Sequence, residues 1–346
     1  MGRDKYQRGG LPFVRVLVTG GLGFIGSNFV RLMLDSTARD EIINIDVMSY
    51  GSNPANLYDL SSDKRYRFVM GNIVDEGFVR PLISRADLVL NFAAETHVDR
   101  SIASGRVFVE SNVVGVYSIL EALRHNTRNT RFIQVGTDEE YGEIGRGSFK
   151  EESALRPSSP YSATKASASM LVSAYVRTYG LDALVTRCTN NFGPYQFPEK
   201  LIPKTIIRAM RNLPVPIYGS GKQVRDWIYV EDYCEALLAV MRRGKTGEIY
   251  NISAGNEIDN LSLVRRILGT MGKNTSLIKH VEDRPGHDFR YSLDSQKIRD
   301  ELGWKPMHPF HKALAETVSW YKRNEAWWRP LADDKVLHPT PWKLRW

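Results

Sequence analysis

Three glycines near the N-terminus constrain the fold of this chain more than any other feature. Gly20, Gly23 and Gly26 form G-x-x-G-x-x-G between a short β-branched run, residues 14–18, and a stretch with helical spacing, residues 24–34. Where side chains are missing, backbone amides and the helix N-terminus can approach a pyrophosphate. Such glycines also allow tight strand-to-helix packing, so the surrounding sequence must decide between a dinucleotide site and a packing motif.

The apolar pattern that follows alternates between strand-like and helix-like segments. Short apolar runs at residues 42–45, 88–92 and 132–135 alternate with amphipathic stretches such as residues 107–123. This alternation predicts an α/β fold with a doubly wound parallel sheet of the Rossmann type. The glycines therefore stand where a dinucleotide would bind.

The character of the sequence changes after about Thr189, where prolines crowd together and turn signals replace regular alternation. We expect a Rossmann domain over residues 13–188, with a returning segment near 226–252. A smaller, mixed substrate-binding lobe is expected over residues 189–330, followed by a C-terminal tail over 331–346. Within these, residues 249–252 resemble a strand, 261–268 a helix and 283–287 a turn.

Composition excludes several classes of protein. The formal charge of +8 comes from basic residues scattered along the chain, which argues against nucleic acid as a partner and suits a small anionic substrate. Cys188 and Cys234 have no ligand-like neighbours, so neither a disulfide framework nor a metal site is expected. Residues 1–12 lack the apolar core of a signal peptide, and no apolar run reaches the ~18 residues of a membrane span. We expect a cytoplasmic protein that does not bind membranes.

Asp46 indicates which dinucleotide the glycines would hold. It closes the strand-like run 42–45 and lies 20 residues beyond Gly26, the spacing at which a carboxylate reaches the adenosine ribose hydroxyls. No arginine follows it to receive a 2′-phosphate, and its charge would repel one. NAD is therefore favoured over NADP, although Asp46 could instead serve only as a loop cap.

Tyr161 and Lys165 form a Y-x-x-x-K pattern that would place both side chains on one face of a helix. A nearby ammonium lowers the pKa of a phenol and lets the phenolate accept a proton from a substrate hydroxyl. The pattern is also common on exposed helices, so its weight comes from the dinucleotide fingerprint upstream.

Thr137, Asp138 and Glu139 follow the strand-like run 132–135, at the sheet edge where doubly wound folds place their sites. Two adjacent carboxyls raise each other's proton affinity, so that one can remain an acid while its neighbour acts as a base. An Asp-Glu pair is also frequent in surface loops. The glycine motif and the Tyr161–Lys165 pattern favour the catalytic interpretation.

Seven segments between about Arg15 and Pro306 resemble the dTDP-glucose 4,6-dehydratases, a branch of the extended short-chain dehydrogenase family. The Asp-Glu pair and the last segment are the most specific to this branch. The seven are TGGLGFIG ending at Gly26, AAETHVDRSI from Ala93, TDE from Thr137, YSATK from Tyr161, NNFGPYQFPEKLIP from Asn190, RDW from Arg225 and DRPGH from Asp283.

The resemblance implies a reaction. Tyr161, supported by Lys165 and Thr137, would deprotonate the 4-hydroxyl of a nucleotide-linked glucose while hydride passes to NAD. Glu139 would then remove the hydrogen on carbon 5, which the 4-ketone acidifies, and Asp138 would protonate the departing 6-hydroxyl. Hydride would return to carbon 6, so that NAD is a bound cofactor regenerated in each cycle.

The resemblance also implies which residues contact each ligand. Arg225 and Arg284 offer forked donors that suit a diphosphate. The implied cofactor-binding residues are Gly20, Gly23, Phe24, Ile25, Gly26, Asp46, Ser49, Asn72, Ile73, Ala93, Ala94, Ser111, Tyr161, Lys165 and Asn191. The implied substrate-binding residues are Thr96, Thr137, Asn190, Lys200, Leu201, Pro216, Tyr218, Arg225, Asn260, Arg284 and His287.

The chain departs from the family pattern at four positions without losing a catalytic group. Asn72 can still accept a hydrogen bond where an aspartate commonly contacts adenine. Glu140 adds a third carboxylate, which is expected to raise the pKa values of Asp138 and Glu139. The departures are Asn72 for Asp, Thr96 for Ser, Gly136 for Ser and Glu140 for Val.

Other functions remain open at this point. A nucleotide-sugar 4-epimerase needs the same tyrosine, lysine and NAD but no acid and base for elimination, and a related dehydratase could act on UDP-glucose. An NAD-binding scaffold would need only the glycines and Asp46. The resemblance also implies a homodimer, through the helices expected at residues 107–123 and 162–179.

Overall fold

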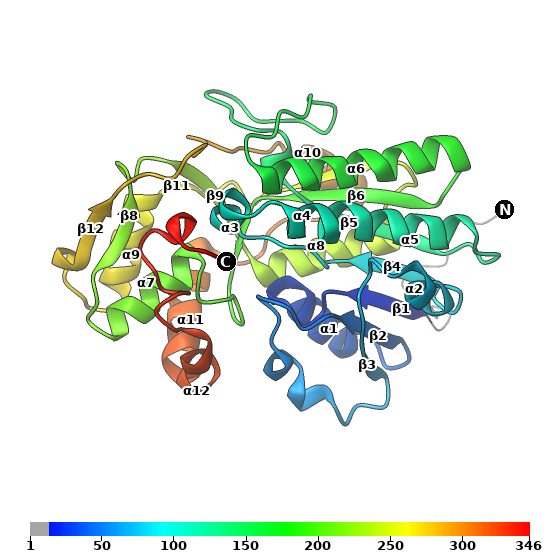
Figure 1. Ribbon diagram of the computed structural model, residues 1–346, viewed down its shortest axis with the longest axis horizontal. Coiled ribbons are helices and arrows are strands. Elements are labelled where there is room, and N and C mark those ends of the chain that lie inside the picture. The colour runs from blue at the N-terminus through cyan, green and yellow to red at the C-terminus, as the bar shows by residue number, and fades with distance from the viewer. Residues whose placement is uncertain (1–13) are drawn as a thin grey trace.

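A seven-stranded sheet, parallel throughout, forms the centre of the larger lobe of the computed structural model, which describes residues 14–346 (Figure 1). The expectations for residues 1–12, and the expected domain start at residue 13, lie outside the described residues. The strand order is β10-β6-β5-β4-β1-β2-β3. The strands are β1 Arg15–Thr19, β2 Glu41–Asp46, β3 Tyr66–Met70, β4 Leu88–Asn91, β5 Arg131–Thr137, β6 Ala183–Cys188 and β10 Ile249–Ile252.

Helices cover both faces of this sheet, because successive residues of its buried strands face opposite sides. Val16 and Val18 of β1 pack in one core with α1, α8 and α10, whereas Leu17 packs in a second core with α2, α5 and α6. The helices are α1 Phe24–Ser36, α2 Glu76–Ile83, α5 Gly115–Arg124, α6 Pro160–Tyr179, α8 Val230–Arg243 and α10 Gln296–Leu302. The doubly wound parallel sheet predicted from the apolar pattern is confirmed.

The strand order reverses between β1 and β4, which lie side by side although two strands separate them in sequence. In doubly wound folds, ligands bind outside the carboxyl ends of the strands at such a switch point. The glycine turn after β1 and the segment after β4 both end at this edge.

Three elements of the larger lobe differ from the sequence expectation. The helix expected at residues 107–123 is interrupted: α4 Arg106–Val109 leads into a π-helical turn, Glu110–Val114, before α5 begins. β3 was not predicted, because it is a mostly exposed edge strand without a continuous apolar run. β6 was not predicted either: it is buried, but Thr186 and Arg187 interrupt its apolar run.

The smaller lobe combines two small sheets with helices. One sheet has the order β11-β9-β7, and β12 pairs with β8 in the other. Its buried apolar residues come from both sheets and from all four of its helices. The elements are β7 Asn190–Phe192, α7 Leu201–Met210, β8 Val215–Tyr218, β9 Val224–Tyr229, β11 Glu257–Asp259, α9 Asn260–Thr270, β12 Ile278–Val281, α11 Phe310–Arg323 and α12 Glu325–Trp328.

The chain passes back into the larger lobe twice. The first return comprises α8 and β10; it starts at Val230, because the residues just before it form the middle strand of the small sheet. The second return is α10, whose Ile298 and Leu302 join the core beside α8. The pattern did not predict this second return.

The C-terminal tail contacts both lobes and ends close to α3, Val98–Ala103 (Figure 1). Two cations of α7 and a third at the residue after it donate to backbone carbonyls of the tail. Two tryptophans of the tail pack on aromatic rings of different lobes. The carbonyl contacts are Lys204 to His338, Arg208 to Leu337 and Arg211 to Ala332. The ring contacts are Trp342 with Tyr218 and Trp346 with Tyr50.

Within residues 14–346, no helix combines the length and apolar character needed to cross a membrane.

Candidate active site

The glycine turn after β1 forms a cradle that larger residues would obstruct. Gly20 has φ of +72°, and a Cβ there would lie 2.5 Å from the backbone nitrogen of Ala93. A Cβ at Gly26 would lie 2.5 Å from the carbonyl oxygen of Gly20. No side chain caps the start of α1, and its first turn carries no acidic residue. The positive end of this helix therefore faces the cleft and suits a pyrophosphate.

Asp46 lies at the end of β2, beside the glycine turn. Its buried carboxylate accepts hydrogen bonds from Leu22 N at 3.0 Å, Met48 N at 2.8 Å and Ser52 Oγ at 2.7 Å. It therefore fixes the loop after β2, and it also borders the cleft above the sheet. The loop-cap and ribose-binding interpretations are compatible in this geometry.

All residues predicted to bind the cofactor line one cleft above the carboxyl ends of β1 and β4. They come from seven separate segments of the chain, so the fold brings together residues as far apart as Gly20 and Asn191. Because the glycine cradle, Asp46, Tyr161 and Lys165 all line it, this cleft fits a dinucleotide such as NAD.

The five predicted catalytic residues line the same cleft. α6 begins at Pro160 with a Ser159 cap, which places Tyr161 in its first turn and Lys165 one turn later. Both side chains are buried, and Lys165 Nζ donates to the carbonyl of Val135 at 2.6 Å. The lysine is thus fixed against β5 beside the tyrosine.

The protonation of Tyr161 differs from the sequence expectation. Burial, and next the charge of Glu139, raise the pKa of Tyr161 well above that of a free phenol, while burial lowers the pKa of Lys165. Lys165 alone therefore does not produce a phenolate, because the desolvation of the phenol outweighs it. The positive charge needed to stabilise a phenolate must come in part from another group in the cleft.

Asp138 and Glu139 follow β5 in a short 3₁₀ turn. Burial, and next the neighbouring Glu139, raise the pKa of Asp138 well above its usual value. Burial also raises the pKa of Glu139, but Arg284 and Arg225 oppose that shift. Asp138 is therefore the stronger candidate for an acid that keeps its proton, and Glu139 for an ionised base.

Glu140 does not act on this pair as expected. Its fully buried carboxylate points beneath the turn, where it accepts from Thr137 N at 3.1 Å and from Arg187 Nε at 2.7 Å. The raised pKa values of Asp138 and Glu139 come mainly from their burial. Glu140 is not among the main causes of these two shifts; its charge acts on Tyr161 and Lys165 instead, and raises the pKa of both.

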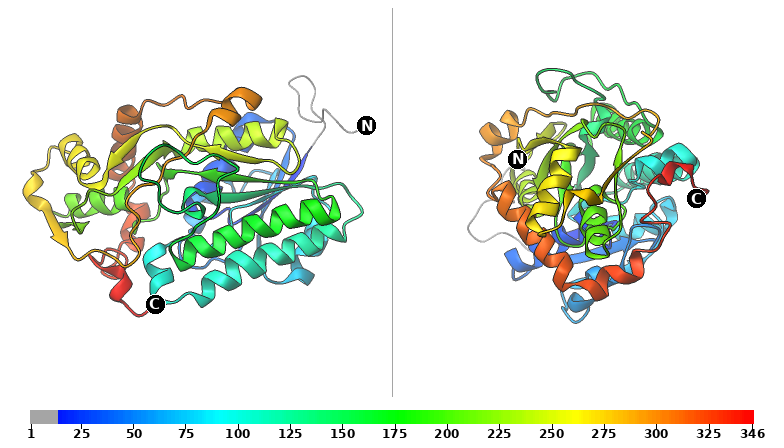
Figure 2. Two further views of the ribbon diagram at one scale, coloured as in Figure 1. Left: turned by 90° about the horizontal axis from the view of Figure 1, so that it is seen from above. Right: turned by 90° about the vertical axis from the view of Figure 1, so that its left-hand side faces the viewer.

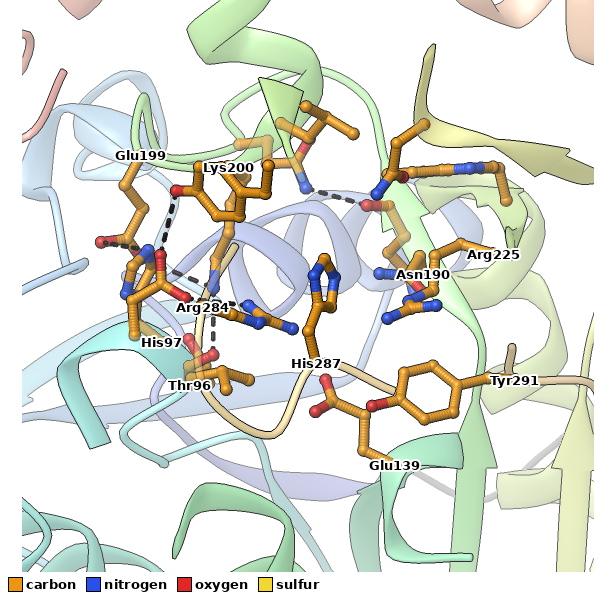
Figure 3. Close-up of a pocket in the computed structure, with 18 of the residues that line it drawn as sticks. Thr96, His97, Glu139, Asn190, Glu199, Lys200, Arg225, Arg284, His287 and Tyr291 are labelled. Atoms are coloured by element: carbon orange, nitrogen blue, oxygen red, sulfur yellow. Dashed lines mark hydrogen bonds and ion pairs between the residues drawn. The ribbon is translucent and has the colours of Figure 1, made fainter. Parts of the chain in front are cut away.

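A second pocket adjoins the first and lies against the smaller lobe (Figure 3). It is lined by all the predicted substrate-binding residues except Thr137, which faces the neighbouring cleft. Glu139 borders both cavities, and Figure 3 shows its carboxylate in the same space as His287 and Arg284. A ligand in the second pocket would therefore meet the candidate base.

Contacts with neighbouring residues fix the two arginines of this pocket in place. Arg284 donates to Asp99 Oδ1 at 2.9 Å, which fixes its guanidinium at the pocket wall. Arg225 donates to the carbonyls of Val224 and Asp288 and lies 4.1 Å from the ring of Tyr291. Both remain positive groups at the wall of a buried pocket, which favours an anionic ligand.

His287 is neutral at physiological pH. Burial, and next the charge of Arg284, lower the pKa of His287 to about 4. Its Nδ1 lies 2.6 Å from Asp283 Oδ1. The ring can therefore act in the pocket as a neutral hydrogen-bonding group.

Several buried polar atoms around the two cavities have no hydrogen-bond partner within the described part of the chain. Buried polar groups are normally paired, so a cluster of unpaired ones indicates a polar ligand. They include Asp138 Oδ2, Asn190 Oδ1, Asn191 Oδ1, Asn260 Oδ1 and Arg284 Nε.

Some residues of the site were not predicted. Asp99 and Tyr291 hold the two arginines, whereas Tyr50 and Arg100 border the cofactor cleft and stack at 4.0 Å. Asp99 and Arg100 lie in a segment quoted for the resemblance, but nothing in their spacing separates an anchoring role from a surface position. In the described residues, no cluster of three or more potential ligands could hold a metal ion.

The fold and this site define a class: the extended short-chain dehydrogenases that act on nucleotide sugars. Residues 17–317 match the family described as GDP-mannose 4,6 dehydratase. The dTDP-glucose 4,6-dehydratase of Streptomyces niveus is 47% identical over 332 residues, which cover 95% of this chain and 98% of that relative. The chain belongs to the dTDP-glucose 4,6-dehydratase family.

Solved structures agree with this assignment. A dTDP-glucose 4,6-dehydratase from Streptomyces venezuelae, solved with NAD and dTDP bound, has a TM-score of 0.90 and 46% identity, covering 92% of this chain and all of that one (100%). A UDP-glucose 4-epimerase from Thermotoga maritima is more distant, with a TM-score of 0.83 and 29% identity over 90% of this chain and 99% of its own. The epimerase shares the fold, so only the residues of the site can distinguish a dehydratase from an epimerase.

Proposed function

We propose that this chain binds NAD and converts dTDP-glucose to dTDP-4-keto-6-deoxyglucose. The observation that carries the proposal is the convergence of Tyr161, Asp138 and Glu139 on one cleft, with Glu139 also bordering the pocket that holds the arginines. An epimerase would use the tyrosine but has no need of the carboxyl pair.

The first step is proton removal at the 4-hydroxyl. Tyr161 accepts this proton as hydride leaves carbon 4, and Lys165, fixed against β5, stabilises the phenolate. When bound, NAD would accept that hydride, return it to carbon 6 and add positive charge to the cleft that Tyr161 lines, which would offset the raised pKa of this phenol.

Elimination then uses the carboxyl pair. The 4-ketone acidifies the hydrogen on carbon 5, and Glu139 removes it as an ionised base. Asp138, whose pKa is raised mainly by burial, holds a proton and gives it to the departing 6-hydroxyl. The carboxyls take different parts because Arg225 opposes the upward shift at Asp138, whereas Arg284, Arg225 and Lys200 together oppose it at Glu139.

The proposed substrate contacts follow from the second pocket. Arg225 and Arg284 face the diphosphate, His287 contributes a neutral hydrogen bond, and Asn190 and Asn260 meet polar groups of the sugar or base. Lys200, whose Nζ donates to the carbonyl of Thr96 at 3.0 Å, links this pocket to the cofactor lobe.

A product assay tests the proposal. The purified protein is incubated with dTDP-glucose and, in parallel, with UDP-glucose, and the sugar products are separated. A 4-keto-6-deoxy product, formed faster from dTDP-glucose, is expected. A galactose product would indicate an epimerase, no product would indicate a scaffold, and faster turnover of UDP-glucose would reassign the substrate.

We further propose a homodimer built on the helices α4, α5 and α6. α5 and α6 lie side by side at one edge of the molecule (Figure 2), and this face exposes large apolar side chains. Large apolar side chains exposed on neighbouring helices suit an interface between subunits. The exposed side chains are Val107, Val109, Val114, Tyr117, Met170 and Tyr179.

We also propose that the protein works in the cytoplasm. Its two cysteines are buried free thiols, as suits a reducing compartment. Detection of the protein by antibody in a secreted or periplasmic fraction would contradict this location.

A further inference from the structure

Glu140 and Arg187 form an ion pair directly beneath the carboxyl pair of the active site. Their side chains are among the most buried of the charged groups, with residue exposures of 0% and 2%. Glu140 Oε2 accepts from Arg187 Nε at 2.7 Å, and Arg187 also donates to Tyr141 Oη at 2.7 Å. Tyr141 in turn donates to Asn251 Oδ1 of β10 at 2.9 Å. The pair thus connects the turn after β5 to β6 and β10.

The other oxygen of Glu140 closes the turn that carries the acid and the base. Glu140 Oε1 accepts from the backbone nitrogen of Thr137 at 3.1 Å, the reciprocal contact of a capping box. A 3₁₀ turn has three residues per turn, so its successive side chains point in three different directions. Fixing Glu140 beneath the sheet edge therefore fixes the directions in which Asp138 and Glu139 leave the turn.

Gly136 makes room for this arrangement. It stands opposite Arg187 in the pairing of β5 with β6, and a Cβ there would lie 2.5 Å from Glu140 Oε1. The two departures from the family pattern near the carboxyl pair, Gly136 and Glu140, therefore belong to one structural feature. The carboxylate of Glu140 occupies the space that a side chain at position 136 would need.

We propose that Glu140 is a positioning residue for the elimination step. Held by Arg187, its carboxylate orients the turn that directs Asp138 and Glu139 toward the substrate, and it does not itself touch substrate or cofactor. This inference rests on the proposed dehydratase function, because it assigns a role in one step of that reaction.

The test compares two double variants that differ only in the capping acceptor. Arg187→Met combined with Glu140→Gln removes both charges but keeps an oxygen that can accept from Thr137 N. Arg187→Met combined with Glu140→Val removes the charges and the acceptor. Neither variant leaves one charge of the pair buried without its partner. Both are therefore expected to fold and to show similar thermal unfolding.

The glutamine variant is expected to keep kcat within about threefold of the wild type. The valine variant is expected to lose kcat by about 100-fold, because small displacements of reacting groups have effects of that size. Its KM for dTDP-glucose should change little. Reduced cofactor should accumulate during its turnover, since the hydride step continues while elimination is slow.

Glu140→Asp keeps the charge against Arg187 but shortens the side chain, and it should show the same loss and the same accumulation. It keeps the test decisive if the valine variant does not fold. Equal kcat values for the two double variants, or losses without accumulation of reduced cofactor, would overturn the inference. A wild-type protein that makes no 4-keto-6-deoxy product would instead overturn the proposed function.

Discussion

At the scale of single residues, the function depends on a division of labour between two neighbouring carboxyls. Burial raises the pKa of both, and the cations of the second pocket act more strongly on Glu139. Asp138 Oδ2 has no hydrogen-bond partner among residues 14–346, as suits an acid that awaits a substrate oxygen. The two carboxyls lie close together because they are adjacent in sequence. Their different surroundings determine which one is the acid and which one the base.

Replacing either carboxyl should separate the two halves of the reaction. Asp138→Asn and Glu139→Gln are each expected to lower kcat by about 10²-fold to 10⁴-fold, the usual contribution of a general acid or base. Reduced cofactor should accumulate in both variants, as measured by its absorbance. Glu152→Gln, a change at an exposed position outside both cavities, serves as the control. Loss of activity without reduced cofactor would place these carboxyls in the hydride step.

The pH dependence follows from the direction of the two shifts. Asp138 must be protonated, so kcat should fall as pH rises through its raised pKa, whereas Glu139 must be ionised, so kcat should fall as pH drops through its own raised pKa. In Asp138→Asn the residual activity should lose the alkaline limb and keep the acid limb. An unchanged alkaline limb in the pH profile of this variant would assign that limb to another group.

At the scale of elements, the turn between β1 and α1 requires glycine at Gly20. Gly20→Ala combines a positive φ with a Cβ only 2.5 Å from Ala93 N, so about 1–3 kcal/mol of strain is expected. The variant should show a lower midpoint in thermal unfolding and weaker NAD binding by calorimetry. Gly145→Ala, where no atom lies within 4 Å of the added Cβ, should leave both unchanged. Equal effects of the two changes would count against a cofactor cradle at Gly20.

Five strands of the central sheet were predictable because they are short runs rich in apolar residues. β6 is just as buried but was not predicted, because Thr186 and Arg187 interrupt its apolar run. β3 escaped prediction because it is exposed, and the π-helical turn before α5 escaped because helical periodicity does not distinguish it from a regular helix. The return of α10 depends on long-range packing of Ile298 and Leu302, which no local pattern encodes.

The site was predictable where residues belong to contiguous motifs. Every residue chosen from those motifs lines one of the two cavities. The residues that support the site were not predictable, because their roles depend on partners far away in sequence. Asp99 holds Arg284, and Arg187 holds Glu140. Arg187 holds Glu140 beneath the turn, and burial is the main cause of the raised pKa values of Asp138 and Glu139, which the position of Glu140 in the sequence did not reveal.

At the scale of the whole molecule, the apolar face of α4, α5 and α6 should govern assembly. Tyr117→Glu combined with Met170→Glu places charges on this face and is expected to convert a dimer to a monomer in light scattering. Met307→Glu changes a methionine that is also exposed but lies outside these three helices, and it should leave the dimer intact. A wild-type mass of one chain at micromolar concentration would refute the proposed homodimer directly.

The central claim is that hydride removal, elimination and hydride return take place on one hexose in one closed site. Incubation with dTDP-glucose carrying deuterium at carbon 4, followed by magnetic resonance of the product, tests it most directly. We predict a 4-keto-6-deoxy sugar with the deuterium at carbon 6 and a solvent-derived hydrogen at carbon 5. A product that retains deuterium at carbon 4, or that has none at carbon 6, would contradict the claim.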